Sequence, residues 1–208
     1  MQWFLIFDTE TTGLPVRNNA PLEDLDNWPR LVQLAWQLHD AEGSLVRAED
    51  FIIKPEGFTI PYSAEKIHGI STEKALKEGM PLTEVLEKFA SDIENSRLLI
   101  AHNIDFDINI VAAEYLRTGI QNTFLKKEKL CTKVESTDFC ALPGGKGGKF
   151  KWPNLAQLHQ KLFEEDFDNA HNASADVEAT ARCFLELARI GVIREDRLKL
   201  TPKEYAAF

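Results

Sequence analysis

Cysteine is scarce in this sequence, and long apolar runs are absent. The 208 residues include three cysteines, Cys131, Cys140 and Cys183, which form no C-x-x-C pair. This spacing indicates neither a disulfide framework nor a zinc site, so buried, inert thiols are expected. No apolar stretch approaches the roughly 18 residues that a membrane-spanning helix needs, and no basic segment precedes the apolar N-terminus. We therefore expect a cytoplasmic protein with no membrane partner.

Basic residues are outnumbered, with 24 Lys and Arg against 33 Asp and Glu and a formal net charge of −9. This balance argues against binding nucleic acid through broad electrostatic attraction. A nucleic-acid enzyme remains compatible, because metal ions in a carboxylate cluster make the local field positive towards phosphate. The 44% of apolar residues suffices for one large domain. We expect that domain over residues 1–208, with a core of about 1–191 and a short C-terminal extension at 192–208.

Apolar periodicity predicts early strands followed by mixed strands and helices. The run at 2–7 predicts a buried strand, and the segments after the polar surface loop at 15–29 predict a hairpin. Further strands are expected at 31–40, 45–55 and 97–103, with 131–136 either a short strand or irregular. Helices are expected at 63–70, 71–79, 81–94, 104–116, 154–163 and 175–190. These elements predict an α/β fold with a mixed central sheet, about five strands in all, flanked by α-helices.

Two acids, Asp8 and Glu10, end the first predicted strand in the stretch WFLIFDTETTGL. Because side chains alternate along an extended chain, both carboxylates point the same way. A lone acid at a strand end is ordinarily a loop cap. Two like charges on one face need a cation, so the pair indicates a candidate site.

A second acidic pair occurs in AHNIDFDINI, where a strand meets a helix. Asp105 and Asp107 flank the apolar stripe of that helix at similar angles, so helical phase leaves both open as site residues. Each acid also suits the positive end of the helix dipole without any further role.

The third acidic group is HNASADVEAT. Ser174 is the expected N-cap of the last long helix, which places Asp176 in its first turn, beside the apolar stripe that begins at Val177. His171 lies in the preceding loop, where a histidine of ordinary pKa can accept a proton at neutral pH. Taken together, the three groups supply what a two-metal phosphodiester site requires, with His171 deprotonating the water.

The segments FDTETTGL, HNIDFD and HNASAD, in this order, resemble the three exonuclease motifs of the DEDDh family. That family includes the proofreading epsilon subunit of bacterial DNA polymerase III, ribonuclease T and oligoribonuclease. The HGI segment and the long helices after it resemble the epsilon-like branch more than oligoribonuclease. The resemblance covers most of the chain. It implies a ribonuclease H-like fold, two Mg²⁺ or Mn²⁺ ions, and stepwise release of nucleoside 5′-monophosphates from a 3′ end.

The resemblance also assigns roles to residues, and in the second motif it selects Asp107 rather than Asp105. The implied metal ligands are Asp8, Glu10, Asp107 and Asp176. Glu10 would also orient the water, and His171 would be the general base. The implied substrate-binding residues are Thr11, Thr12, Gly13, Leu14, His68, His102 and Asn103. Leu14 would be a wedge against the terminal base, while His68 is equally suited to ending a helix before a glycine cap.

The stretch LPGGKGGKFKWP departs from the phosphate-binding template G-x-x-x-x-G-K-[ST], so it predicts a flexible loop. Lys146, Lys149 and Lys151 are a local basic group that suits single-strand phosphates, with Trp152 stacking on a base. The alternative, which we favour, is that Trp152 and Pro153 start the next helix.

These patterns predict an exonuclease that acts on a single-stranded or frayed 3′ end of DNA in proofreading or repair. A polymerase or repair complex is a candidate partner, although the short stretch after the last helix predicts no long docking tail like that of epsilon. An RNA-directed exoribonuclease is the alternative enzyme. A non-catalytic, polymerase-associated binding module is the third hypothesis, but such a protein is expected to lack a ligand or the base, and none is missing.

Overall fold

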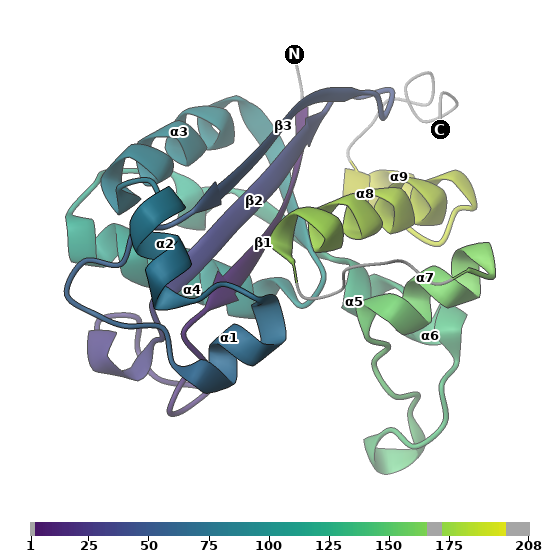
Figure 1. Cartoon of the computed structure of the whole chain (residues 1–208). Helices are drawn as coiled ribbons and strands as arrows, with labels where there is room; N and C mark the ends of the chain where they lie inside the picture. Colours follow the sequence, from purple (N-terminus) through teal and green to yellow (C-terminus); the bar gives the residue numbers. More distant parts are fainter. Residues whose placement is uncertain (1–2, 166–171, 199–208) are drawn as a thin grey trace.

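The computed structural model describes residues 3–165 and 172–198. Its strands form one sheet in the order β3-β2-β1-β4-β5, in which β1 pairs antiparallel with β2 and parallel with β4. The strands are β1 (Trp3–Thr11), β2 (Leu31–His39), β3 (Leu45–Ile52), β4 (Ser96–Ala101) and β5 (Glu128–Cys131). The predicted α/β fold with a mixed five-stranded sheet flanked by helices is confirmed (Figure 1).

Helices occupy both faces and one end of the sheet. The α-helices of the described ranges are α1 (Tyr62–His68), α2 (Thr72–Glu78), α3 (Leu82–Asn95), α4 (Ile104–Thr118), α5 (Thr132–Glu135), α6 (Thr137–Cys140), α7 (Leu155–Phe163), α8 (Ala173–Arg189) and α9 (Glu195–Leu198). Short 3₁₀ turns occur at η1 (Leu25–Asn27), η2 (Phe124–Lys126) and η3 (Lys146–Gly148). Among these helices, none has the length and apolar character needed to span a bilayer.

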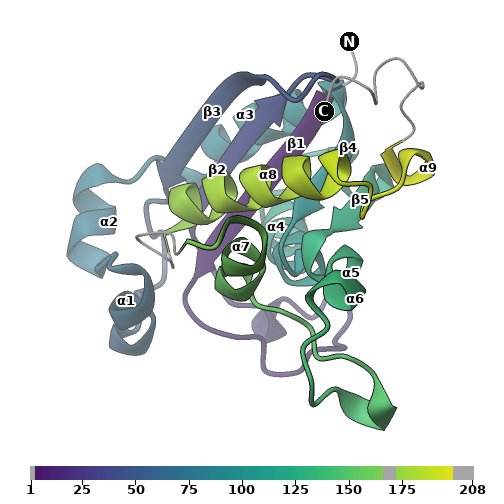
Figure 2. The same cartoon turned by 90° about the vertical axis from the view of Figure 1, so that its right-hand side faces the viewer.

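Strand β1 lies at the centre of the sheet and is buried on both faces. Its even-numbered residues Phe4 and Ile6 pack in a core with α8, and the ring centroids of Phe4 and Phe184 are 5.3 Å apart. Its odd-numbered residues Leu5 and Phe7 pack in a second core with α3 and α4. Figures 1 and 2 show α8 and α3 on opposite sides of the sheet. Consecutive residues of β1 therefore contribute to two separate hydrophobic layers.

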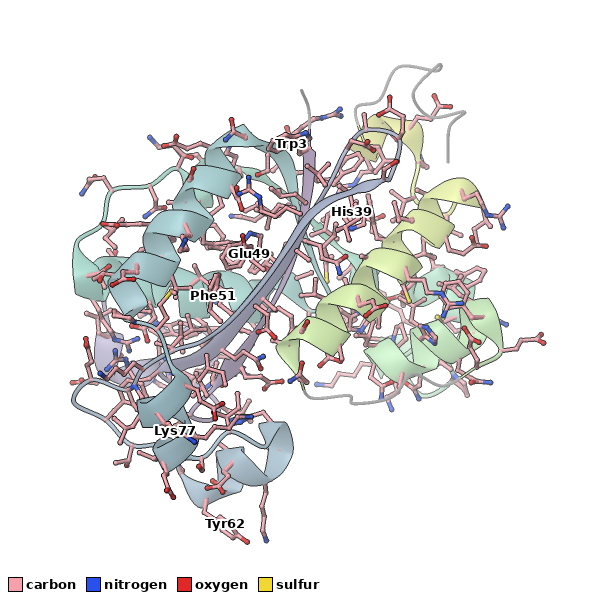
Figure 3. The ribbon with its side chains drawn as sticks, turned by 45° about the horizontal axis from the view of Figure 1, so that its top comes forward. Trp3, His39, Glu49, Phe51, Tyr62 and Lys77 are labelled. Atoms are coloured by element: carbon pink, nitrogen blue, oxygen red, sulfur yellow. The ribbon has the colours of Figure 1, made fainter. Side chains whose placement is uncertain are left out.

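The layer under α3 is rich in aromatic rings. Trp36 of β2 lies 5.5 Å from Phe51 of β3 and 5.0 Å from Phe89 of α3, measured between ring centroids. Its indole N–H donates to Asp92 over 2.8 Å, which satisfies the polar atom of a buried ring. Figure 3 shows Phe51 on β3 beside α3.

Two strand boundaries differ from the prediction. Strand β1 continues to Thr11, beyond the expected end at residue 7, because Asp8 and Glu10 stay in register with Ala35 and Gln33 of β2. Strand β5 precedes the segment 131–136, most of which forms the short helix α5. The acids therefore lie within strand β1, in the part that pairs with β2 and extends beyond the pairing with β4, which ends at Ile6.

Helix α8 begins two residues earlier than expected, at Ala173. Asn172 is its N-cap, because its side-chain oxygen accepts from the backbone N–H of Ser174 at 3.1 Å and of Ala175 at 3.4 Å. The prediction that Ser174 caps this helix was wrong, since an equally good capping residue stands where the chain first turns. The predicted apolar stripe is confirmed by the burial of Val177, Ala181, Phe184 and Ala188.

Helix α7 begins at Leu155 with Asn154 as its N-cap. The side chain of Asn154 accepts from the backbone N–H of Gln157 at 2.8 Å, and the Gln157 side chain accepts from the backbone N–H of Asn154 at 3.0 Å. The prediction that Trp152 and Pro153 start this helix was wrong, because this reciprocal cap fixes the start two residues later.

The segment 15–29, predicted as a surface loop, is hydrogen-bonded to α4. Trp28 is 4% exposed, and the Arg117 side chain donates to its carbonyl oxygen over 2.7 Å. Glu114, which is fully buried, forms ion pairs with Arg30 at 2.9 Å and Arg117 at 3.1 Å. These contacts hold the segment against the body of the protein.

All three cysteines are free. Cys140 and Cys183 are buried as predicted, whereas Cys131 is half-buried. Burial raises the pKa of the Cys183 thiol to about 12. A thiol with such a pKa is unreactive at neutral pH, as expected for a core residue.

Candidate active site

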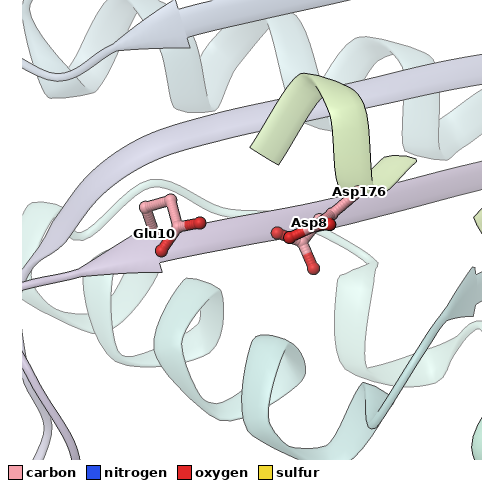
Figure 4. Close-up of side chains that lie close together, drawn as sticks. All are labelled: Asp8, Glu10 and Asp176. Atoms are coloured by element: carbon pink, nitrogen blue, oxygen red, sulfur yellow. The ribbon is translucent and has the colours of Figure 1, made fainter. Parts of the chain in front are cut away.

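Three carboxylates meet on the α8 face of β1. Asp8 and Glu10 continue the even-numbered face that begins with Phe4 and Ile6, so both side chains point towards the α8 layer. Asp176 lies in the first turn of α8. One carboxylate oxygen from each of these three acids lies within 4.8 Å of the others (Figure 4). The structure therefore brings the first and third acidic motifs together.

Asp107 approaches from the opposite layer. It lies in the first turn of α4, and its Oδ1 accepts from the backbone N–H of Thr9 at 3.1 Å and from the Thr9 hydroxyl at 2.6 Å. Asp107 is 3% exposed, whereas Asp105 is exposed to solvent. This placement favours Asp107 over Asp105, a choice that helical phase left open.

Burial and the charges of neighbouring acids raise the pKa values of Asp8, Glu10 and Asp107. Burial raises the pKa of Asp107 to about 7, although hydrogen bonds from Thr9 lower it. Burial also raises the pKa of Glu10 to about 7, and the charges of Asp176 and Asp107 add to that shift. The pKa of Asp8 is raised well above its ordinary value by burial first, and then by the charges of Asp107, Asp176 and Glu10. The carboxyls oppose one another's ionisation.

The donor chemistry of the cluster fits hard divalent cations. Asp8, Glu10 and Asp176 offer carboxylate oxygens, which Mg²⁺ and Mn²⁺ prefer over nitrogen or sulfur donors. Asp107 lies outside this group of three, and its place as a fourth ligand stays a prediction. A nearby divalent charge would favour the ionised acids and remove the repulsion that raises their pKa values. The identity and number of the ions stay predictions.

His171, the predicted general base, lies outside the described residues. The first residue of α8, Ala173, donates its backbone N–H to the side-chain oxygen of Gln33 over 3.3 Å. Gln33 is the β2 partner of Glu10 in the sheet register. The role of His171 stays a prediction.

The residues predicted to receive the 3′ nucleotide form a braced turn after β1. The Thr11 hydroxyl donates to the Gly13 carbonyl over 2.6 Å, and the Thr12 hydroxyl oxygen accepts from the backbone N–H of Arg30 at 2.9 Å. Gly13 has a φ of 150°, which residues with a side chain rarely adopt. Leu14 follows with an exposed fraction of 82%. The turn is rigid, and its apolar end is open to a ligand.

His68 lies at the end of α1 and faces the same turn. Its Nδ1 accepts from the backbone N–H of Ile70 at 3.1 Å. Burial lowers its pKa, against an interaction with the Thr11 carbonyl that raises it. Gly69, with a φ of 72°, ends the helix. His68 therefore serves as a helix-end residue and also contacts the turn, and its role in substrate binding stays a prediction.

His102 and Asn103 connect β4 to α4 and contact residues beyond β5. His102 bonds to the Thr132 hydroxyl through Nδ1 at 3.0 Å and to the Pro153 carbonyl through Nε2 at 3.1 Å. Burial lowers its pKa to about 4, so Nε2 donates and Nδ1 accepts in a neutral ring. The side-chain oxygen of Asn103 accepts from Lys133. Both residues thus contact the segment 132–153, and their role in substrate binding stays a prediction.

Sequence reasoning missed Thr9 as a supporting residue of the site. It stands between Asp8 and Glu10 but points to the other face of the sheet, where it holds Asp107. Strand alternation, applied to the whole D-T-E triplet, is the signal that predicts a residue facing the α4 layer at this position. Strand alternation does not predict that Asp107 is the partner of Thr9, because this contact depends on how α4 packs against the sheet.

The sequence of the chain is similar to that of known exonucleases and polymerases. The exonuclease family model matches residues 5–184 of the chain. The PolC-type DNA polymerase III of Streptococcus pyogenes serotype M2 (strain MGAS10270) is 31% identical over 189 residues, which is 89% of this chain and 11% of the relative. The PolC-type polymerase of Lactococcus lactis subsp. lactis (strain IL1403) is 30% identical over 192 residues, covering 89% and 10%. The chain therefore spans about a tenth of the length of these relatives.

Solved structures share the fold. E. coli exonuclease I in complex with a dT13 oligonucleotide superposes with a TM-score of 0.70 and 22% identity, covering 96% of this chain and 43% of that one. An exonuclease I from Methylocaldum szegediense also gives a TM-score of 0.70, at 20% identity, with 99% and 42% covered. At such identities the likeness shows the fold alone. The exonuclease family model, in contrast, spans all three acidic motifs and confirms the resemblance to DEDD-type 3′-5′ exonucleases: the chain belongs to the exonuclease family.

Proposed function

We propose that this chain is a metal-dependent 3′-5′ exonuclease that releases nucleoside 5′-monophosphates from the 3′ end of DNA. The observation that carries the proposal is the convergence of Asp8, Glu10 and Asp176 on the α8 face of the central strand, with the charge of Asp107 acting on Asp8 and Glu10. A half-buried cluster of mutually repelling acids costs stability unless it binds cations.

The four acids would hold two Mg²⁺ or Mn²⁺ ions. Such ions, when bound, stabilise the negative charge that develops on the phosphate and the leaving oxygen. The chain itself fixes the ligands: pairing with β2 continues along β1 through Asp8 and Glu10, while Thr9 holds Asp107 through two hydrogen bonds to one oxygen. This rigid placement is what a catalytic site requires of its scaffold.

The reaction is hydrolysis of the terminal phosphodiester. His171 in its neutral form accepts a proton from the attacking water, and Glu10 orients that water. The water oxygen bonds to phosphorus, and the bond from phosphorus to the 3′ oxygen of the penultimate nucleotide breaks. The Thr11–Leu14 turn receives the terminal nucleotide, with Leu14 against its base and His68 beside the turn.

The names of the relatives support DNA as the substrate. The PolC-type proteins are DNA polymerases by name, and the E. coli exonuclease I structure contains a dT13 oligonucleotide. We accordingly assign a single-stranded or frayed 3′ end of DNA as the substrate, and proofreading or repair in the cytoplasm as the role. A polymerase or repair complex is the implied partner.

Hydrolysis of a 5′-labelled single-stranded DNA oligonucleotide tests the proposal. With Mg²⁺ or Mn²⁺ we expect a ladder that shortens from the 3′ end, and with EDTA we expect none. Asp107→Ala should abolish the ladder, whereas the matched control Asp105→Ala should retain it. A general base contributes about 10²–10⁴-fold, so His171→Ala should lose activity by that factor.

Two outcomes would contradict the proposal outright, and two others would favour an alternative. The first is the absence of a ladder with either metal, and the second is a ladder that persists after Asp8→Ala. A faster rate on RNA of matched sequence would instead assign the chain to the alternative, an RNA-directed exoribonuclease. Tight DNA binding without any turnover would favour a non-catalytic binding module.

A further inference from the structure

A cleft of about 720 Å³ lies beside the junction of β4 and α4. The residues that give it its chemical character are Lys133, Lys146, Lys149, Phe150, Lys151 and Trp152, and we call it the lysine cleft. His102 and Asn103, at the junction, also line it. Its size suits a ligand larger than an ion or a water cluster.

The charge of the lysine cleft is opposite to that of the whole chain. Four lysines line it, and none of the described residues of its lining is an aspartate or glutamate. The chain as a whole carries a net charge of −9. Because the positive charge is concentrated here against that background, the cleft attracts an anionic ligand.

Two exposed aromatic side chains stand among the lysines. Trp152 is 61% exposed and Phe150 is 46% exposed. The Lys133 ammonium lies 4.6 Å from the centroid of the Trp152 ring. Alternating aromatic rings and cations are the pattern by which proteins hold single-stranded nucleic acid, with bases on the rings and phosphates on the cations.

The backbone of the loop that carries these residues is held in place by its own contacts. Its base is closed by pairing between Leu142 and Lys151, whose backbone N–H donates to the Leu142 carbonyl over 2.8 Å. Within it, a Cβ on Gly145 would lie 2.4 Å from the carbonyl oxygens of Lys149 and Phe150. Gly145 therefore permits a close backbone approach that any side chain would prevent.

The lysine cleft is joined to the acidic cluster through α4. Asn103, which accepts from Lys133 in the cleft, precedes the helix whose first turn carries Asp107. Four residues of helix separate these positions by about 6 Å along the axis. A strand that has its 3′ end at the acids and passes the start of α4 would therefore run towards the lysine cleft.

We propose that the lysine cleft binds the single-stranded DNA that lies 5′ of the scissile phosphate. This proposal rests on the proposed exonuclease function, and it adds a second binding region that makes hydrolysis depend on substrate length. Lysines 133, 146, 149 and 151 would neutralise backbone phosphates, and Trp152 would stack on a base.

Salt dependence supplies the expected magnitude. For single strands the logarithm of the binding constant falls with the logarithm of salt by about 0.7 per neutralised phosphate. Replacing Lys146, Lys149 and Lys151 by Ala should therefore reduce that slope by about 2. Between 50 and 200 mM salt, the wild-type chain should lose roughly 20-fold more affinity than the triple variant.

The test measures Kd for 5′-labelled dT12 in EDTA by fluorescence anisotropy, over this salt range. It then compares kcat/KM on dT12 with kcat/KM on dT2 in Mg²⁺. We expect the triple variant to bind dT12 at least tenfold more weakly at 50 mM salt and to lose most of the preference for dT12. Trp152→Ala should weaken binding by about tenfold, because stacking on an aromatic ring is worth about 1–3 kcal/mol per base. The matched control replaces Lys77, Lys88 and Lys126, which are exposed and lie outside the cleft.

The outcomes separate this inference from the proposed function. If neither dT12 nor dT2 is hydrolysed, the exonuclease proposal fails whatever the binding result. If the wild-type chain hydrolyses dT12 and the triple variant shows the same Kd, salt slope and length preference as wild type, the lysine cleft does not bind the strand. An equal loss in the control triple variant would also overturn the inference, because it would show a general effect of charge.

Discussion

Replacing Asp107 by Asn should stabilise the metal-free protein while abolishing its activity. In the structure, the pKa of Asp107 rises from 3.8 to about 7, mainly through burial. The two hydrogen bonds from Thr9 both end on one oxygen of Asp107, and the amide oxygen of Asn can accept them in the same way. The substitution therefore removes the negative charge and keeps both hydrogen bonds from Thr9.

The size of the effect follows from linkage between ionisation and folding. One pKa unit corresponds to about 1.4 kcal/mol, so ionising Asp107 costs the folded chain roughly 4 kcal/mol relative to the unfolded chain above pH 7. Because the folded-state pKa is raised, this cost is absent below about pH 4, grows as the pH rises, and is constant above about pH 7. The gain from Asp107→Asn should be roughly 4 kcal/mol at pH 7.5 and roughly 2 kcal/mol at pH 5.

Urea denaturation in EDTA, followed by tryptophan fluorescence at pH 7.5 and at pH 5, measures this difference. The matched control is Asp105→Asn, an exposed acid in the same helical turn, which should change the free energy of unfolding by less than about 0.5 kcal/mol. Adding Mn²⁺ should stabilise the parent chain more than the Asp107→Asn variant. The reasoning is refuted if the variant is less stable than the parent in EDTA, or if its gain is the same at both pH values.

Two further predictions concern residues away from the acids. Asn172→Ala removes the N-cap of α8 and should lower the free energy of unfolding by about 1 kcal/mol, whereas Ser174→Ala should change it by less than about 0.5 kcal/mol; equal effects in urea denaturation would contradict the assigned cap. Glu114→Ala leaves the side chains of Arg30 and Arg117 without their buried partner and should cost about 3–5 kcal/mol. A loss below about 1 kcal/mol in the same assay would show that the ion-pair cluster contributes little.

Local patterns predicted the sheet, the main helices and the common face of Asp8 and Glu10, because strand alternation and helical periodicity depend on neighbouring residues. The stripe of α8 was predictable for the same reason. The N-cap of α8 was not, since Asn172 and Ser174 are both good capping residues and the choice depends on how the helix packs against β2.

Long-range contacts were beyond local patterns. Helical phase alone did not decide between Asp105 and Asp107, because the deciding contact is with Thr9, 98 residues away in sequence. The charged cluster of Glu114 is likewise made by segments that meet only in the folded chain. Trp152 was predicted to start a helix. Its position in the lysine cleft could not be predicted from neighbouring residues, because it depends on a contact with Lys133, which is distant in sequence.

The two hydrophobic layers on either side of the sheet have a consequence for local unfolding. Asp107 belongs to the layer of α4 and Asp176 to the layer of α8, and each layer has its own core. A cation shared by the two acids would be released whenever either helix opened. Its binding free energy would therefore add to the opening free energy of both layers at once. Amide hydrogen exchange would then slow in both α4 and α8, and occupancy of one small site would make two separate cores behave as one cooperative unit.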